Sequence, residues 1–261
     1  MLFKGRIATF ALFIISATFS PLKLNGAHLV GGEITYTCSG GNSYEIKLRI
    51  YRDCNGNGAA FDQSVNFTIF DDQGNILFNP SVSKGATVQV PAATGNPCLT
   101  TPPNICTEYA EYIHTISLPA RVGGYTISYQ RCCRNATIAN IVSSGKGNTY
   151  TIQIPSMDNC NSTPQFTTVP PIVLCKSDAL NIDASAADAN GDSLFYEFCD
   201  ILNGGSSFNP SPNSADPPPY TAIPFISPQT SSTPIPGAPA LSINPNTGFI
   251  TGVANTTGQF V

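Results

Sequence analysis

The stretch "YEIKLRIYRDC", Tyr44 to Cys54, decides the fold class, because apolar and polar residues alternate along most of its length. Alternation places every second side chain on one face of an extended strand. The apolar row of this stretch consists of Tyr44, Ile46, Leu48 and Ile50. The stretch therefore predicts a β-strand with one buried face.

The same alternation recurs between Gly32 and Pro155, with turn signals such as "SGGNS", "DDQGN" and "SGKGN" between the runs. Helical spacing is nearly absent. We therefore predict an all-β chain that begins with a disulfide-containing antiparallel β-sandwich. The further apolar rows are Tyr112, His114, Ile116 and Leu118; Tyr125, Ile127 and Tyr129; and Tyr150, Ile152 and Ile154.

The chain divides into three predicted parts: a signal peptide over 1–27, an N-terminal β-sandwich domain over 28–162 and a second β domain over 163–261. Lys4 and Arg6 precede the apolar run "IATFALFIISATF", which is typical of a secretory signal peptide and too short for a membrane-spanning helix. Two stretches offer the small residues of a cleavage site, one ending at Ser20 and one ending at Ala27. We favour cleavage near Ala27. The protein is therefore expected to be secreted or cell-surface, with no membrane insertion after signal removal.

A proline-rich stretch marks the second domain, with eleven prolines from Phe208 to Pro245. Proline cannot donate a ladder hydrogen bond, so this stretch is not a central strand. We predict a long ordered loop or polyproline II segment that lies over the domain. Its aromatic residues Phe208, Tyr220 and Phe225 are a candidate contact surface, although a loop that only covers the domain explains them equally well.

Charged residues make up 11% of the chain, against roughly 25% in an average soluble domain. The net charge is −4, without a basic run. Such a chain has no electrostatic footprint for nucleic acid or for an anionic membrane surface. We expect a polysaccharide or protein ligand and no nucleic-acid partner.

Nine cysteines in an exported chain indicate a disulfide framework. Cys132 and Cys133 continue a strand, so alternation predicts that their side chains point to opposite faces and do not pair. Cys54 shares the apolar parity of its strand, which makes Cys54–Cys133 a predicted core bridge. Cys98 and Cys106 are expected to close one loop. The odd cysteine and the apolar end "TTGQFV" indicate a fragment of a larger parent chain, and a free thiol is the alternative.

Two turns are candidate calcium sites. Asp188, Asn190 and Asp192 stand at alternate positions of "DANGDS", where a tight turn can bring their oxygens together around the ion. The alternative is a solvated turn with Asx hydrogen bonds.

The second candidate set is Asp53, Asn55, Asn57 and Asp62 in "DCNGNGAAFD". Ser64 stands where an EF-hand has its bidentate carboxylate, so an ordered, bridged hairpin loop is preferred there. Ca²⁺ is the one cofactor that the sequence raises.

Catalytic signatures are absent from the sequence. The histidines are His28 and His114, and no Ser-His-Asp order, H-E-x-x-H helix or phosphate-binding glycine loop occurs. Paired carboxylates leave no spacing signal and stay open. We predict a protein that is not an enzyme.

Several motifs carry a family resemblance: "AHLVGGEITYTC", "YEIKLRIYRDCNGNGAAFD", "PCLTTPPNIC", "GGYTISYQRCCRN" and "PPIVLC". Together they resemble the N-terminal region of large, gliding-motility-associated bacterial surface proteins that the type IX system exports. "DANGDSLFYEF" and "LSINPNTGFITG" resemble an Ig-like or cadherin-like module of the He_PIG type, here truncated at its C-terminal end.

The resemblance implies a non-catalytic, structural or adhesive module of a large multi-domain surface protein. The alternative is a carbohydrate-binding or accessory module of a secreted hydrolase.

Overall fold

The computed structural model describes residues 29–55, 58–91, 106–156, 160–169 and 171–261. Its regular elements are fourteen β-strands in antiparallel sheets, with no helix among these residues. The predicted all-β class is therefore confirmed, and the predicted signal peptide lies outside the described residues.

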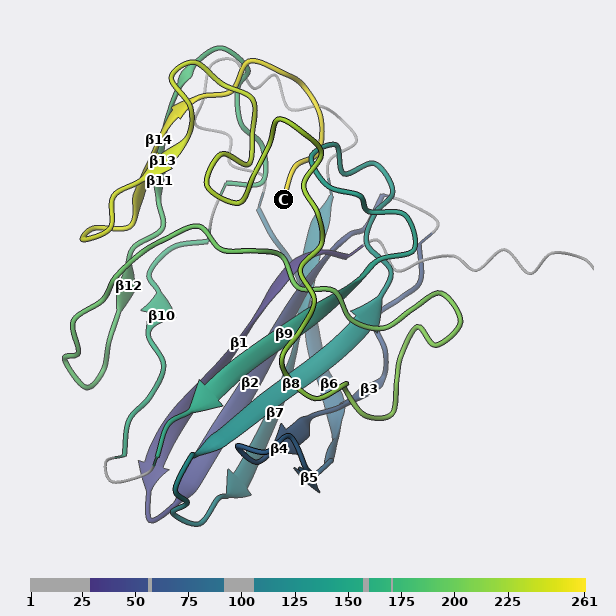
Figure 1. Cartoon of the computed structure of the whole chain (residues 1–261), viewed down its shortest axis with the longest axis vertical. Helices are drawn as coiled ribbons and strands as arrows, with labels where there is room; N and C mark the ends of the chain where they lie inside the picture. Colours follow the sequence, from purple (N-terminus) through teal and green to yellow (C-terminus); the bar gives the residue numbers. More distant parts are fainter. Residues whose placement is uncertain (1–28, 56–57, 92–105, 157–159, 170) are drawn as a thin grey trace, which may run out of the picture.

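Two sheets form the N-terminal β-sandwich (Figure 1). The five-stranded sheet has the order β1-β2-β7-β6-β3, and the four-stranded sheet has the order β5-β4-β8-β9. The first sheet contains β1 (Leu29–Gly40), β2 (Ser43–Asp53), β7 (Thr107–Ser117), β6 (Ser81–Gln89) and β3 (Ser64–Asn66). The second contains β5 (Ile76–Phe78), β4 (Thr68–Phe70), β8 (Tyr125–Cys132) and β9 (Gly147–Ile154).

The predicted apolar rows line the interior of this sandwich. Leu48 lies opposite Tyr112 across β2 and β7, and Ile127 lies opposite Ile152 across β8 and β9. Residues that share a face and a register position pack together across strands. Side chains of both sheets belong to one buried apolar cluster, and His114 is half-buried on its predicted row.

The outer faces of the two sheets differ in charge. On the five-stranded sheet, Arg49 lies between Glu33 and Glu111 on the neighbouring strands, with N–O distances of 3.0 and 2.6 Å. The outer row of β8 consists of the neutral polar residues Thr126, Ser128 and Gln130, and all three are buried. A neutral polar face of this kind must be covered by groups that form hydrogen bonds with it.

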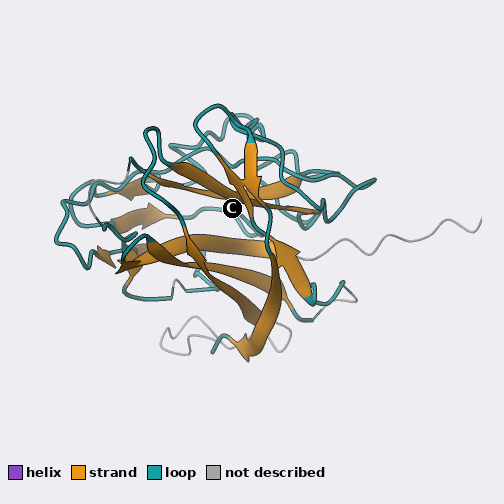
Figure 2. Ribbon diagram, turned by 90° about the horizontal axis from the view of Figure 1, so that it is seen from below, coloured by secondary structure: helices purple, strands orange, loops and turns teal. Residues whose placement is uncertain are grey.

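The C-terminal part contains only short strands. They are β10 (Gln165–Phe166) paired with β12 (Ala186–Ala187), and a three-stranded sheet of β11 (Ala179–Asp183), β14 (Phe249–Val253) and β13 (Ser242–Ile243). Long loops connect them (Figure 2). The division at residue 162 and the Ig-like or cadherin-like assignment stay predictions.

The connection between the two parts is docked on strand β1. Thr163 exchanges backbone and hydroxyl hydrogen bonds with Tyr36, and a disulfide joins Cys38 to Cys160 with a Cα–Cα distance of 5.5 Å. The start of the C-terminal part is thereby fixed to one edge of the sandwich.

Candidate functional site

The segment 202–221, which we call the covering segment, lies over the outer face of the four-stranded sheet (Figure 1, green). It belongs to the C-terminal part but covers the N-terminal sandwich, and it includes the first part of the proline-rich stretch. The predicted loop character of this segment is thus confirmed, but its predicted position is wrong: it lies on the four-stranded sheet of the N-terminal sandwich and not over the second domain. Its backbone forms hydrogen bonds with side chains of β8, β9 and β4 and with backbone amides of β8 and β9.

Hydrogen bonds hold the first half of the covering segment. The backbone amide of Gly147 donates to Asn203 Oδ1 at 2.9 Å, and Thr149 Oγ1 donates to the Asn203 carbonyl at 2.6 Å. Farther along, the amide of Cys132 donates to the Pro210 carbonyl at 2.9 Å. The segment therefore follows the ends of β8 and β9.

The second half returns along the same sheet. The amide of Ala215 donates to Thr68 Oγ1 at 2.8 Å, and that of Asp216 donates to Gln130 Oε1 at 3.1 Å. The Tyr220 hydroxyl contacts Ser128 Oγ at 2.5 Å. Burial raises the pKa of Tyr220 above its ordinary value of 10.0, although the hydrogen bond with Ser128 opposes this shift. The hydrogen bond to Ser128 ties the Tyr220 ring to the sheet.

Two glycines allow the covering segment to approach the sheet closely. A Cβ at Gly204 would collide with Thr149 Oγ1 and with the Gln130 side chain. Gly205 has φ +70°, which favours glycine, and its Cβ position lies 3.0 Å from the amide nitrogen of Cys132. Side chains at these two positions would lift the segment from β8 and β9.

A pocket of about 350 Å³ lies between the two halves of the covering segment and the sheet. This volume is within the range of about 300–1,000 Å³ that is usual for small-molecule sites. No Lys, Arg or His occurs among the described residues that line it, and Asp216 is its one carboxylate. Its polar side chains include Gln130, Asn203, Ser206, Asn209, Asp216 and Tyr220.

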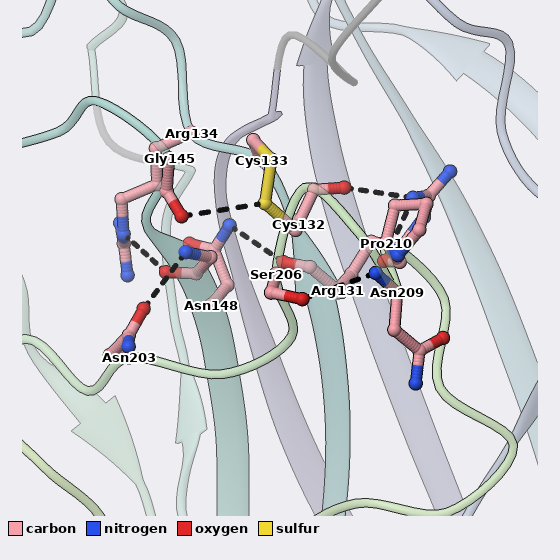
Figure 3. The surroundings of a disulfide bond; sticks show 11 residues. Arg131, Cys132, Cys133, Arg134, Gly145, Asn148, Asn203, Ser206, Asn209 and Pro210 are labelled. Carbon is pink, nitrogen blue, oxygen red and sulfur yellow. Dashed lines mark hydrogen bonds between the residues drawn. A yellow bond between two sulfur atoms is a disulfide. The ribbon is translucent and has the colours of Figure 1, made fainter. Parts of the chain in front are cut away.

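A disulfide between Cys132 and Cys133 lies at the end of β8, beside the covering segment (Figure 3). Arg131 contacts Asp62 with N–O distances of 2.7 and 3.1 Å and also donates to the Pro210 carbonyl at 2.9 Å. The strand end, the disulfide and the covering segment thus form one connected group of contacts.

Three disulfide predictions are wrong. Cys132 and Cys133 pair with each other, because β8 ends at Cys132 and the alternation rule does not extend to Cys133. Cys54 therefore pairs with Cys106 and not with Cys133. This pairing also removes Cys106 from the predicted loop with Cys98, which lies outside the described residues.

The remaining cysteines differ in state. Cys175 is disulfide-bonded, and Cys199 is free and exposed. Cys199 is thus the odd cysteine, and both the predicted partner in a larger parent chain and the free thiol stay predictions for it.

The acidic turn has most of its named oxygens engaged by N–H donors. Asp188 Oδ1 accepts the amides of Asn190 and Asp192 at 2.8 and 3.0 Å. Asn190 Oδ1 accepts the amide of Ser162 at 2.9 Å, and Asp192 Oδ2 accepts Asn161 Nδ2 at 2.9 Å. The turn is therefore bonded to Asn161 and Ser162 of the connection in this structure. Calcium binding here stays a prediction, which a thermal melt with and without EDTA tests.

The other calcium candidates have competing contacts as well. Asp53 Oδ1 accepts the amide of Asn55 at 2.9 Å, and the Asp62 carboxylate faces Arg131. Asn57 lies outside the described residues, so calcium binding by the set of Asp53, Asn55, Asn57 and Asp62 stays a prediction. In the described part of the chain, no three His, Cys, Asp or Glu side chains gather in a group suited to a metal ion.

Comparison with known proteins found no matching family model, no matching curated protein and no matching solved structure. The resemblance to gliding-associated surface proteins therefore stays a prediction. Among the described residues, no helix has the length and hydropathy needed to cross a membrane.

Sequence reasoning missed most of the pocket residues. Gln130, Asn203 and Asp216 come from separate stretches that show no common motif. One local signal was present, the pair Gly204–Gly205 between two polar residues. Tyr220 belonged to the predicted contact surface and does line the pocket.

Proposed function

We propose that the chain is a non-catalytic, exported cell-surface module, a structural and adhesive part of a larger gliding-associated or adhesin-like protein. One observation carries the proposal: a long loop fixed on a disulfide-braced sandwich forms a concave polar surface. Binding residues are often found on loops that a rigid scaffold holds in position. A surface that is ordered before binding costs less entropy when a ligand binds.

The disulfides support export. The Cys38–Cys160 and Cys54–Cys106 bridges connect residues 122 and 52 positions apart. Bridges of this kind form and persist outside the cytoplasm. The predicted signal peptide over 1–27 provides the route, and the low charge of the chain fits a surface that binds neutral partners.

Adhesion is tested with microspheres that carry the oxidised chain 28–261. They are passed at rising shear over surfaces coated with polysaccharide or with protein, and the retained fraction is counted. We expect retention on at least one surface above that of microspheres carrying the reduced, unfolded chain. Equal loss of both kinds of microsphere on every surface would contradict an adhesive role.

Export is tested with a fusion of residues 1–27 to an alkaline phosphatase that becomes active only after its disulfides form outside the cytoplasm. We expect phosphatase activity, and loss of that activity when residues 8–19 are deleted. An inactive full fusion that is present in the cell would contradict export by this segment.

The pocket also favours the alternative function, a carbohydrate-binding or accessory module of a secreted hydrolase. The two functions differ in the parent chain and not in this module. Release of reducing ends from polysaccharide by chain 28–261, abolished in Asp216→Asn, would show that the module itself is catalytic. We expect no release.

A further inference from the structure

We propose that the pocket beneath the covering segment is a binding site for a neutral saccharide of one or two sugar rings. The inference rests on the proposed adhesive function and names the class of ligand that this surface recognises. It depends on the shape of the pocket, the charge of its lining and the position of two aromatic residues.

The walls of the pocket are fixed by groups that do not have to move when a ligand enters. Asn203 is held by Gly147 and Thr149, and Asp216 is held through its amide by Gln130. The volume of about 350 Å³ is enough for a small molecule. A site that is already formed can bind a small ligand through few contacts, because little ordering is required.

The charge of the lining favours neutral ligands over anionic ones. The described lining residues include no cation, and Asp216 is exposed and makes no ion pair within the described part of the chain. A phosphate, sulfate or carboxylate group would therefore be repelled by Asp216 without compensation. Neutral hydroxyl groups suit this lining, because each both donates and accepts hydrogen bonds.

A single carboxylate among amides and hydroxyls matches the hydrogen-bonding pattern of a sugar ring. Its two oxygens can accept hydrogen bonds from two adjacent hydroxyl groups, and such charge-assisted bonds are stronger than neutral ones. Asn209 and Ser206 lie in the same lining and offer further polar groups. The pocket thus has one strong acceptor and several neutral polar groups.

Aromatic residues supply the apolar contact that a sugar ring also needs. Tyr220 lines the pocket, and its hydroxyl is tied to Ser128. Phe208 does not belong to the lining, but it is 98% exposed and stands in the chain between Ser206 and Asn209, which both line the pocket. The C–H faces of a sugar carry partial positive charge, and the negative face of an aromatic ring attracts such groups. Tyr220 supplies this apolar contact within the lining, and Phe208 is an exposed phenylalanine next in the chain to lining residues.

The test begins with the oxidised chain 28–261 on a printed array of neutral and acidic oligosaccharides. Each bound neutral sugar is then titrated as its methyl glycoside by calorimetry. We expect Asp216→Asn to weaken binding about tenfold, and Phe208→Ala to weaken it about fivefold. The matched controls are Asp178→Asn, which removes an exposed carboxylate outside the pocket lining, and Phe195→Ala, which removes an exposed phenylalanine that is not next in the chain to lining residues. Both controls should leave the affinity unchanged, and melting curves verify that all four variants fold.

The outcomes separate this inference from the proposed function. Binding of neutral sugars that falls only in the pocket variants supports the saccharide site. Binding restricted to acidic sugars, or equal loss in the control variants, overturns it. No sugar binding together with microsphere retention on protein surfaces also overturns it, but leaves the adhesive function standing. Loss of both signals overturns both.

Discussion

The N-terminal sandwich buries twenty apolar side chains in one cluster, whereas two further clusters in the described structure have three buried members each. One of these small clusters joins Ile138 and Ile141, from the segment between β8 and β9, to Ile223 of the C-terminal part, with the partly buried Ile201, Phe225 and Val261 packed against it. The sandwich is therefore stabilised by its own core. The C-terminal part has only small apolar clusters, and hydrogen bonds to the sandwich and the Cys38–Cys160 bridge also hold it in place.

Core truncation should show the largest difference between the two parts. Leu48 is fully buried in the large cluster, and Leu241 is 6% exposed in a cluster of three buried residues. We expect Leu48→Ala to lower the free energy of unfolding by about 2–5 kcal/mol, because it leaves a cavity in a tightly packed core. Leu241→Ala should cost less than half as much. Urea unfolding followed by circular dichroism measures both, and equal losses would contradict a dominant N-terminal core.

The second largest difference is expected between two disulfides, in the stability that is lost when each is removed. The Cys38–Cys160 bridge closes 122 residues, so Cys38→Ala/Cys160→Ala should cost about 2–4 kcal/mol by releasing the unfolded chain. The Cys132–Cys133 bridge has a sequence separation of 1 and restricts almost no chain. Cys132→Ala/Cys133→Ala should therefore cost only the local packing around Cys132. Melting temperatures of the two double variants measure this, and a larger loss from the vicinal pair would contradict it.

Displacement of the covering segment should have a smaller, local effect. Gly204→Ala places a methyl group against Thr149 and Gln130, and we expect a cost of about 1–3 kcal/mol. Hydrogen exchange should accelerate at the amides of Gly147 and Thr149. Gly31→Ala is the matched control, because its Cβ meets no atom within 4 Å. Unchanged exchange in Gly204→Ala would show that the segment does not depend on close approach.

Two carboxylates should show the smallest effect, through pH. The pKa of Asp71 is lowered from its ordinary value of 3.8 first by the Asn75 amide, with Gln73 and Arg121 also contributing, and the pKa of Asp183 is lowered by Ser185. A lowered pKa in the folded state stabilises the protein above the ordinary pKa, and this contribution disappears as pH falls through the folded value.

Asp71→Asn should therefore lower the melting temperature at pH 7 but much less at pH 3. Asp183→Asn should show the same trend with a smaller change, because it lacks a cation. Melting curves of both variants at the two pH values measure it. Equal destabilisation at both pH values would show that the charge is not responsible.

Local patterns predicted the sandwich well and the pocket poorly. The rows containing Leu48 and Ile127 could be identified because alternation along one strand already sets which side chains share a face. The opposite row of β8, with Ser128 and Gln130, follows from the same rule. Its burial does not, because it requires a partner 70 or more residues away in the chain.

The disulfides show the same limit. The number of cysteines correctly indicated a bridged chain, but the pairing of Cys54 with Cys106 depends on which strand ends come together. The parity argument for Cys133 failed at one residue, because β8 ends at Cys132.

Residue order alone thus determined the all-β class, the inward-facing rows, the disulfide framework and the loop character of the proline-rich stretch. All of these follow from backbone geometry and composition over a few neighbouring residues. Only the tertiary structure decided the cysteine partners, the sheet that the covering segment protects and the pocket between them. Those features arise from contacts between distant parts of the chain, which short-range periodicity does not encode.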